Sequence, residues 1–421
     1  MILLLHLKFK KSAIIIYETR LGNKEMLMDK ITNKRFDEVF DLSLGRTPSR
    51  GVGSYWGGTH TWVSIADMSC GKYISESKEY ITDKALSDTH IPIVKKGTVI
   101  MSFKLSIGKV CIADTDLYTN EAIMAFVPKP QYKILPEFLY YYLMCYQWNN
   151  SNEVVLGFTL NKKTISQSIV SIPTSLAEQE RIVDILDREF ERIDALKANA
   201  EQNLQHAKDL FQSALKQELQ PKEGWETKKL ADICTITSSK RIFKSEYVSN
   251  GVPFYRTKEI KEIANNIPIS VELYISTERY LEIKNRFGVP KINDLLVSAV
   301  GTIGEIMVVN NDNPFYFKDG NLVWLRDIQG VDSLYLKYYL KSIIDDIKNL
   351  TRGAAYNALT IEKFQEMSIS FTSIAEQRKI VARLDILNER CKALEENYKK
   401  TIALCDDMKQ ALLRKAFNGE L

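Results

Sequence analysis

Two arginines lie in a glycine- and proline-rich stretch close to aromatic residues. Residues 44–50 read LGRTPSR, residues 55–58 read YWGG, and Trp62 follows. Arginine, serine and threonine side chains bind phosphate oxygens, and arginine also reads base edges in a DNA groove. We therefore predict that this stretch contacts nucleic acid. The predicted contact residues are Arg46, Thr47, Ser49, Arg50, Tyr55 and Trp56.

A similar set of residues recurs in the second half of the chain. Residues 238–241 read SSKR, residues 255–258 read YRTK, and the turn KLSIGK at 104–109 corresponds to SAVGTIG at 298–304. For any single residue, a solvated loop with structural tryptophans is an equally good interpretation, but the recurrence of the whole set favours nucleic acid. The set adds Lys104, Lys240, Arg241, Arg256, Lys258 and Ser298 to the predicted DNA-binding residues.

Motifs that carry chemistry are incomplete in this sequence. GVG at 51–53 does not follow a clear strand, and IGKV at 107–110 lacks the upstream glycine and the Ser/Thr of a phosphate-binding P-loop. NPFY at 313–316 is similar to the Asn/Asp-Pro-Pro-Tyr loop of amino-methyltransferases, but it lacks the second proline and a glycine-rich cofactor segment. The 4 histidines and 6 cysteines have no zinc-ligand spacing. We predict no catalytic residue, no metal site and reduced, cytoplasmic cysteines.

The elements that position these residues are duplicated. LAEQERIVDILD at 176–187 matches IAEQRKIVARLD at 374–385, at a constant offset of 198 residues. The tripeptide YYL at 141–143 recurs at 338–340 at nearly the same offset. A period of this length is domain-sized. Lys and Arg total 57 against 53 Asp and Glu, so a net charge of +4 neither requires nor excludes nucleic acid as a partner.

Each copy ends in a long heptad-patterned helix, predicted at 173–220 and 372–417. Two seams of matched length favour antiparallel pairing of these helices over packing of each on its own domain. The globular parts, 29–172 and 225–371, mix short strand-like runs with helices, which predicts an α/β (α+β) fold. Residues 1–28 are predicted to be an N-terminal extension, too weakly apolar for a membrane span. The predicted seam residues are Leu186, Phe190, Ile193, Ala200, Leu204, Ala207, Phe211 and Ala214, then Leu384, Leu387, Cys391, Leu394, Tyr398, Cys405, Met408 and Leu412.

From residue 29 onward the chain resembles the DNA specificity subunits of type I restriction-modification systems. The resemblance covers several segments in the same order, including GRTPSR, WVSIADM, SIGKV, TIGEI, NEAIMAFVPK, GWETKKLADIC, both helix openings and the closing LLRKAFNGEL. The second copy departs from the pattern, because CTITSSKR at 234–241 lacks the Gly-x-Thr-Pro of the first copy.

The resemblance implies a division of labour. Two target recognition domains each read half of a split, asymmetric DNA sequence, and the paired helices set the gap between the halves. The helices hold two methyltransferase subunits that use S-adenosylmethionine to methylate adenine, and restriction adds two ATP- and Mg-dependent translocase-nuclease subunits. The specificity subunit itself holds no cofactor and is not an enzyme. Two alternatives stay open: an orphan specificity subunit, or a coiled-coil scaffold whose globular parts bind protein.

Overall fold

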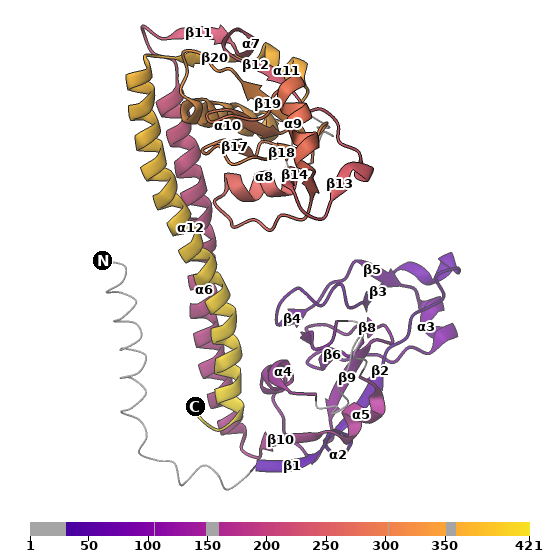
Figure 1. Ribbon diagram of the computed structural model, residues 1–421. Coiled ribbons are helices and arrows are strands. Elements are labelled where there is room, and N and C mark those ends of the chain that lie inside the picture. Colours follow the sequence, from indigo (N-terminus) through magenta and orange to yellow (C-terminus); the bar gives the residue numbers. More distant parts are fainter. Residues whose placement is uncertain (1–30, 105, 149–159, 302, 351–358) are drawn as a thin grey trace. The chain divides into compact units, whose positions relative to one another are not determined.

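The computed structural model describes residues 31–104, 106–148, 160–301, 303–350 and 359–421. It divides into two compact units, the first formed by Met1–Ala198 with Ile402–Leu421 and the second by Asn199–Thr401. Each unit contains a globular head and part of both long helices (Figure 1). The predicted N-terminal extension, residues 1–28, lies outside the described residues.

Two sheets form the head of the first unit. The larger has the strand order β2-β9-β6-β7-β4 and is antiparallel except where β4 lies parallel to β7. The smaller has the order β5-β3-β8, in which β3 is antiparallel to β5 and parallel to β8. Their strands are β2 (Phe40–Leu44), β9 (Ile123–Pro128), β6 (Val99–Ser102), β7 (Val110–Ala113), β4 (Tyr73–Ile74), β5 (Glu79–Ile81), β3 (Trp56–Val63) and β8 (Tyr118–Thr119).

The second unit repeats this topology. Its first sheet, β12-β19-β16-β17, corresponds to β2-β9-β6-β7, and in its second sheet β14 is antiparallel to β15 and parallel to β18. The strands are β12 (Thr235–Thr237), β19 (Leu322–Arg326), β16 (Leu295–Ser298), β17 (Ile306–Val308), β13 (Tyr247–Val248), β15 (Tyr274–Ile275), β14 (Val252–Tyr255) and β18 (Tyr316–Phe317). The predicted duplication and mixed α/β class are therefore confirmed.

Shorter elements complete both heads. In the first unit they are β1 (Ile31–Arg35), paired antiparallel with β10 (Ile169–Pro173), and helices α2 (Phe36–Val39), α3 (Asp83–Thr89), α4 (Pro136–Cys145) and α5 (Lys162–Gln167). In the second they are β11 (Glu226–Lys229), paired antiparallel with β20 (Ser368–Phe371), and α7 (Leu230–Ile233), α8 (Thr257–Ala264), α9 (Thr277–Arg286), α10 (Ser333–Leu350) and α11 (Ile361–Glu366). Short 3-10 turns occur at η2 (Gly53–Tyr55) and η3 (Lys244–Glu246).

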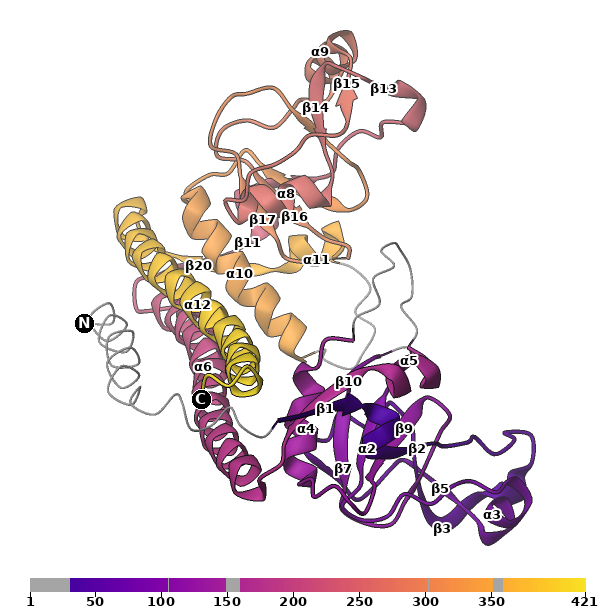
Figure 2. The same ribbon diagram turned by 90° about the horizontal axis from the view of Figure 1, so that it is seen from below.

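The long helices α6 (Leu176–Leu219) and α12 (Ile374–Phe417) have 44 residues each. At 1.5 Å per residue each extends about 66 Å. In the first unit the start of α6 pairs with the end of α12, through Lys197–Asp406 at 2.7 Å. In the second unit Arg383 of α12 pairs with Glu218 of α6, also at 2.7 Å. The helices are therefore antiparallel, as predicted, and they lie side by side in Figures 1 and 2.

The buried stripe follows the predicted heptads except near the ends of the pair. Met408 was predicted to lie in the seam but is 42% exposed, and Leu413 and Ala416 are buried instead. Likewise Leu215 is fully buried, whereas the predicted Ala214 is half-buried. A straight helix drifts by about 20° per heptad relative to a strict 7-residue repeat. In addition, these turns pack against a head as well as a helix, which moves the buried side by one residue.

Each head is attached to its long helix by one buried glutamine. Gln179 donates hydrogen bonds to the carbonyls of Lys133 and Pro173, both at 3.0 Å, and accepts one from the Leu135 amide at 2.9 Å. Its repeat equivalent makes the same set of contacts in the second unit. Gln377 donates to the carbonyls of Gly330 and Thr372 and accepts from the Asp332 amide.

A tyrosine–aspartate pair makes a second attachment. Tyr141 of α4 donates a hydrogen bond to Asp187 of α6, and Tyr338 of α10 donates to Asp385 of α12. Burial is the main cause that raises the pKa of both tyrosines, with the hydrogen bond next, so both stay protonated donors. The repeated YYL and LD segments therefore each supply one residue of this second contact between head and helix. Among the described helices, none is long and apolar enough to span a membrane.

Candidate nucleic-acid interface

The loop between β2 and β3 brings the first six predicted residues together beside the smaller sheet. Gly45 begins it where the backbone passes so close to Thr119 that a Cβ atom would lie 1.9 Å from the Thr119 carbonyl oxygen. The Arg46 amide donates to this same carbonyl at 2.8 Å. The Arg46 guanidinium reaches the carbonyl of Thr89, at the end of α3, at 3.0 Å. The loop is thus held from both sides, with Pro48 buried and the side chains of Arg46, Thr47, Ser49 and Arg50 exposed.

The Arg50 side chain is 56% exposed and has both an aromatic and an acidic neighbour. Its guanidinium lies 4.0 Å from the centre of the Trp56 ring, and it forms a two-bond pair with the carboxylate of Glu79. The hydrogen bond from Arg50 is the main cause that lowers the pKa of Glu79. The tryptophans differ in role, because Trp62 is buried and donates to the Arg46 carbonyl at 3.0 Å. Trp56 packs edge-on against Trp62 and supports Arg50.

The other predicted residues of the first unit lie along the same surface. Tyr55 donates from its hydroxyl to Asp88 at 3.1 Å, and the Ser49 carbonyl accepts from the Trp56 indole at 3.3 Å. Thr47 donates a hydrogen bond to Glu121, and this bond is the main cause that lowers the pKa of the Glu121 carboxylate. The Lys104 charge also lowers the pKa of Glu121. The charge of Lys104, from the distant turn after β6, therefore acts on the same carboxylate that Thr47 binds.

An equivalent contact occurs in the second unit. Arg241 donates to Asp319 at 2.8 Å, and this carboxylate follows β18 as Glu121 follows β8. Lys240 lies beside it, with its amine 5.2 Å from the centre of the Phe287 ring. The Lys240 backbone amide donates to the hydroxyl of the buried Tyr316 at 2.6 Å. The loop after β12 therefore takes the place of the loop after β2, although its sequence differs.

Arg256 and Lys258 stand at the start of α8 and share acidic partners. Arg256 pairs with Glu259, which is only 1% exposed, and with Glu272 at 2.9 Å. The hydrogen bond to Glu259 is the main cause that raises the pKa of Arg256. Lys258 reaches Glu272 at 2.8 Å. To bind a phosphate, either cation must donate from N–H groups that its acidic partners do not use, or it must break its ion pair with Glu272.

Ser298 is the one predicted contact residue that the structure removes from the surface. Its side chain is fully buried, and its hydroxyl accepts a hydrogen bond from the Glu305 amide at 2.8 Å. Ser102 has the same place in the first unit and accepts from the Lys109 amide at 3.1 Å. These serines close the turns that carry the SIGK and TIGE motifs. The burial of Ser298 argues against a DNA contact, and the turn recurs in both copies because these serines close it.

Sequence reasoning missed the acidic partners of the predicted cations. Glu79, Glu272 and Asp319 lie 14 to 78 residues away from the basic residues they bind. No local sequence pattern indicates such pairs. They hold the cations in fixed positions before any ligand binds. Among the described residues, no cluster of His, Cys, Asp and Glu could hold a metal ion.

Comparison with known proteins agrees with this architecture. A family model described as "Type I restriction modification DNA specificity domain" matches residues 28–206 and again 222–404. The type I restriction enzyme MjaIX specificity subunit of Methanocaldococcus jannaschii is 24% identical over 417 residues, covering 92% of this chain and 93% of that protein. The EcoBI specificity subunit of Escherichia coli is 24% identical over 311 residues, covering 66% of this chain and 64% of that protein.

Solved structures show the same fold. A chain from a study of complex assembly and conformational transition in the type I R-M system superposes with a TM-score of 0.74 at 20% identity, covering 94% of this chain and 99% of that chain. The HsdS subunit of Thermoanaerobacter tengcongensis superposes with a TM-score of 0.56 at 21% identity, covering 95% of this chain and 99% of that one. Since the family model covers both copies of the repeat, the chain belongs to the type I restriction-modification DNA specificity family.

Proposed function

We propose that this chain directs a type I restriction-modification complex to a bipartite DNA sequence, each head reading one half. The observation that carries the proposal is that the two units share one framework but differ in their surface loops. The topology and the glutamine attachments repeat, whereas the surface loops differ in sequence and in length. A repeated frame with different surfaces suits two readings of different DNA sequences.

The cations support DNA over a protein ligand for the heads. Arg46 and Arg50 in the first unit and Lys240 and Arg241 in the second project from loops onto exposed surface. Bonds to a carbonyl or a carboxylate fix the three arginines in place, which suits phosphate contacts that set the register of a protein on the duplex. If the heads bind DNA, affinity falls with salt at a slope of about −0.9 per phosphate neutralised. A scaffold that binds protein through these heads has no such dependence on phosphates.

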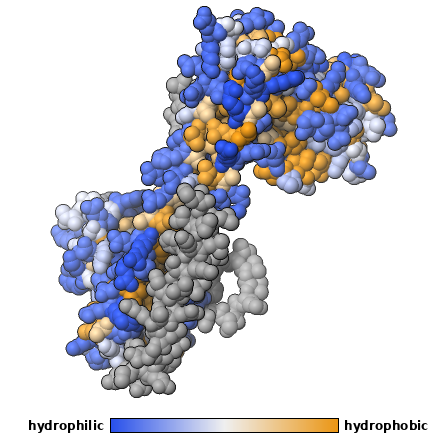
Figure 3. All heavy atoms as spheres, turned by 90° about the vertical axis from the view of Figure 1, so that its left-hand side faces the viewer, coloured by the Kyte–Doolittle hydropathy of each residue, from blue (hydrophilic) through white to orange (hydrophobic). Residues whose placement is uncertain are grey.

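The partner subunits supply the chemistry in this proposal. Two methyltransferase subunits bring S-adenosylmethionine, two translocase-nuclease subunits bring ATP and Mg, and this chain acts without a cofactor or a catalytic residue. The long helices offer a surface for such partners, because Leu196, Leu210, Ile386 and Leu404 are exposed on them. On the helix-bearing side of the second unit, Figure 3 shows apolar patches between hydrophilic ones. Because the substrate is genomic DNA, we expect the complex to act in the cytoplasm.

Long-read mapping of adenine methylation tests the proposal directly. Cells that express this chain with its methyltransferase subunit are compared with cells that lack this chain. We expect a new two-part methylated motif that disappears without the chain. If no motif appears although the methyltransferase subunit is bound and active, the orphan or scaffold alternative is the better explanation.

A helix insertion tests the separate idea that the helices set the gap. Seven residues are added after Ala198 in α6 and after Thr401 in α12, so that the heptad pairing is kept. This lengthens the pair by about 10 Å, or about three base pairs of B-DNA. We expect a longer gap between two unchanged half-sites. An unchanged gap would show that the helices do not set it.

A further inference from the structure

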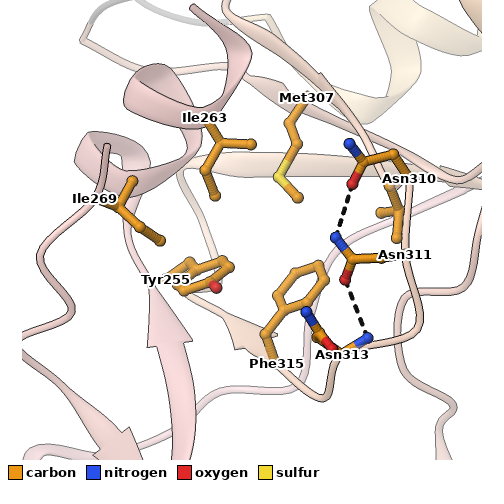
Figure 4. Close-up of a pocket in the computed structure, with 9 residues that line it drawn as sticks. Tyr255, Ile263, Ile269, Met307, Asn310, Asn311, Asn313 and Phe315 are labelled. Carbon is orange, nitrogen blue, oxygen red and sulfur yellow. Dashed lines mark hydrogen bonds between the residues drawn. The ribbon is translucent and has the colours of Figure 1, made fainter. Parts of the chain in front are cut away.

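The second head contains an open pocket of about 280 Å³ beside α8 (Figure 4). Its floor is the outer side of an apolar cluster, where Met307, Val309 and Phe315 are buried. Tyr255 stacks on Phe315 with ring centres 4.8 Å apart and an angle of 21° between the planes. Ile263 of α8 and Ile269 from the loop after it close one side, and in Figure 4 the Met307 thioether points into the space.

Three asparagines form the opposite rim. Asn311 is committed to the loop itself, because it donates to the Asn310 side chain at 2.8 Å and accepts from the Asn313 backbone amide at 3.0 Å. The Asn310 side chain keeps its amide N–H groups after this contact. The Asn313 side-chain amide has no hydrogen-bond partner among the described residues. The rim therefore offers amide donors and acceptors above an aromatic and apolar floor.

This pocket is built from segments that differ between the two heads. The connection from β17 to β18 has seven residues (309–315), whereas the connection from β7 to β8 has four (114–117). In the first head, Leu117 and Val94 bridge their backbones at 2.8 and 2.9 Å across the short connection. Helix α8, which supplies Ile263, stands where the first head has only turns after β3. The pocket therefore belongs to the part of the second head that differs from the first head.

The chemistry of the residues that line the pocket limits which class of ligand it can bind. None of the nine described residues that line the pocket is charged, which argues against an anion or a metal ion. A purely aliphatic ligand leaves the rim amides unpaired. A nucleobase has apolar faces and donor–acceptor edges, and asparagine pairs with such an edge through two hydrogen bonds. Pockets for drug-sized ligands begin at about 300 Å³, so this one suits a molecule of one or two rings.

We propose that this pocket receives a nucleobase from the second half-site, taken out of the base stack. The inference rests on the proposed function, because the DNA is its source. A base that stays in the stack meets only the exposed asparagines, since Met307 and Phe315 lie below the rim. A base that leaves the stack reaches the floor, where aromatic and apolar side chains cover its faces.

The test uses the complex of this chain with its methyltransferase subunits. 2-Aminopurine, which brightens when it leaves the stack, replaces each base of the second half-site in turn. Methyltransferases flip the base that they methylate, so a rise at that adenine is expected whatever the pocket does. We expect a second rise on binding, at one other position of the second half-site, and this second rise is the signal of the pocket. Ile269→Trp fills the pocket from its rim and is expected to abolish that rise and to weaken binding about tenfold or more. The matched control is Ile267→Trp, two residues away in the same loop, where the side chain is 52% exposed and outside the lining.

A second pair of variants avoids any change in the apolar floor. Asn313→Ala removes one rim amide and is expected to weaken binding about tenfold, the usual effect of one lost two-bond contact to a base. Asn250→Ala, at another exposed turn of the same unit, is expected to bind like the unchanged protein. Circular dichroism and retained recognition of the first half-site show that each variant is folded.

The possible outcomes distinguish a failure of the pocket proposal from a failure of the proposed function. The same complex, without DNA, is titrated with adenosine, guanosine, cytidine and thymidine. Nucleoside binding that Ile269→Trp abolishes, with no second rise from 2-aminopurine, shows a free nucleoside as the occupant and overturns the DNA source. If neither signal appears while the complex still binds its two-part site, the pocket proposal is wrong and the proposed function stands. If the unchanged complex does not bind DNA, the proposed function fails.

Discussion

Removing the buried glutamine of the second unit should destabilise that unit as a whole. Gln377 is fully buried, and it serves three backbone groups at once: the carbonyls of Gly330 and Thr372 at 3.1 and 2.7 Å, and the amide of Asp332 at 2.7 Å. Gln377→Ala leaves all three without this partner. A buried polar group that loses its partner costs about 1–3 kcal/mol, although a carbonyl often finds a second donor.

We therefore expect Gln377→Ala to lower the free energy of unfolding by about 3 kcal/mol, a large part of the usual 5–15 kcal/mol. The change is measured by urea unfolding, followed by circular dichroism. The control is Gln410→Ala, at an exposed position of the same helix, where we expect a change within about 0.5 kcal/mol. Gln377→Glu should be nearly as harmful as Gln377→Ala, because a carboxylate cannot donate to the two carbonyls.

The repeat supplies an internal comparison. Gln179 makes the equivalent three bonds in the first unit, so Gln179→Ala should cost a similar free energy there. The reasoning is refuted if Gln377→Ala differs from the Gln410→Ala control by less than about 0.5 kcal/mol, since three lost bonds must exceed the effect of a surface change. A cost at only one of the two glutamines would refute the equivalence of the two attachments.

Three further predictions follow from individual contacts. Arg50→Ala should weaken DNA binding and reduce its salt slope by about 1. Glu79→Gln removes a negative charge that repels DNA phosphates beside Arg50, so it should tighten binding by up to about fivefold; titrations at several salt concentrations check both. Glu218→Gln should cost less than about 1 kcal/mol at pH 7, because the pair with Arg383 is partly exposed. The hydrogen bond from Arg383 lowers the folded-state pKa of Glu218 from 4.5, so this stabilisation is present above the ordinary pKa and is lost as pH falls through the lowered one. Urea unfolding at pH 7 and at a series of pH values below 4.5 should show the difference between the two proteins narrow as pH falls. Ser298→Ala should lower the free energy of unfolding by about 1–2 kcal/mol and leave the methylated motif unchanged, as melting and methylation mapping can show.

The repeat and the helix pair could be predicted because they are periodic. The offset of 198 residues predicted two copies of one domain, and the heptads predicted antiparallel helices. The buried stripe departs from these heptads at Ala214 and Met408. There each helix also packs against a head, and a pattern read along one helix carries no information about a third neighbour.

The surface loops were predictable in composition but not in contact. Arg50 was predicted as a cation beside aromatic rings, and it does lie over Trp56. Its carboxylate partner Glu79 lies in β5, 29 residues along the chain, and no local pattern indicates that pair. Ser298 was predicted to contact DNA because its turn recurs in both copies. In the structure its hydroxyl instead accepts a hydrogen bond from the Glu305 amide and closes that turn.

By itself the sequence determined the duplication, the mixed α/β class, the paired helices and the likeness to a known family. These depend on periodicity and on residue types within short segments, which local physical chemistry translates into helices, strands and turns. Only the tertiary structure decided which cations are already paired, that two glutamines join heads to helices, and that a pocket opens beside α8 in the second head. These features are contacts between residues far apart in the chain, and such contacts follow from how the elements pack.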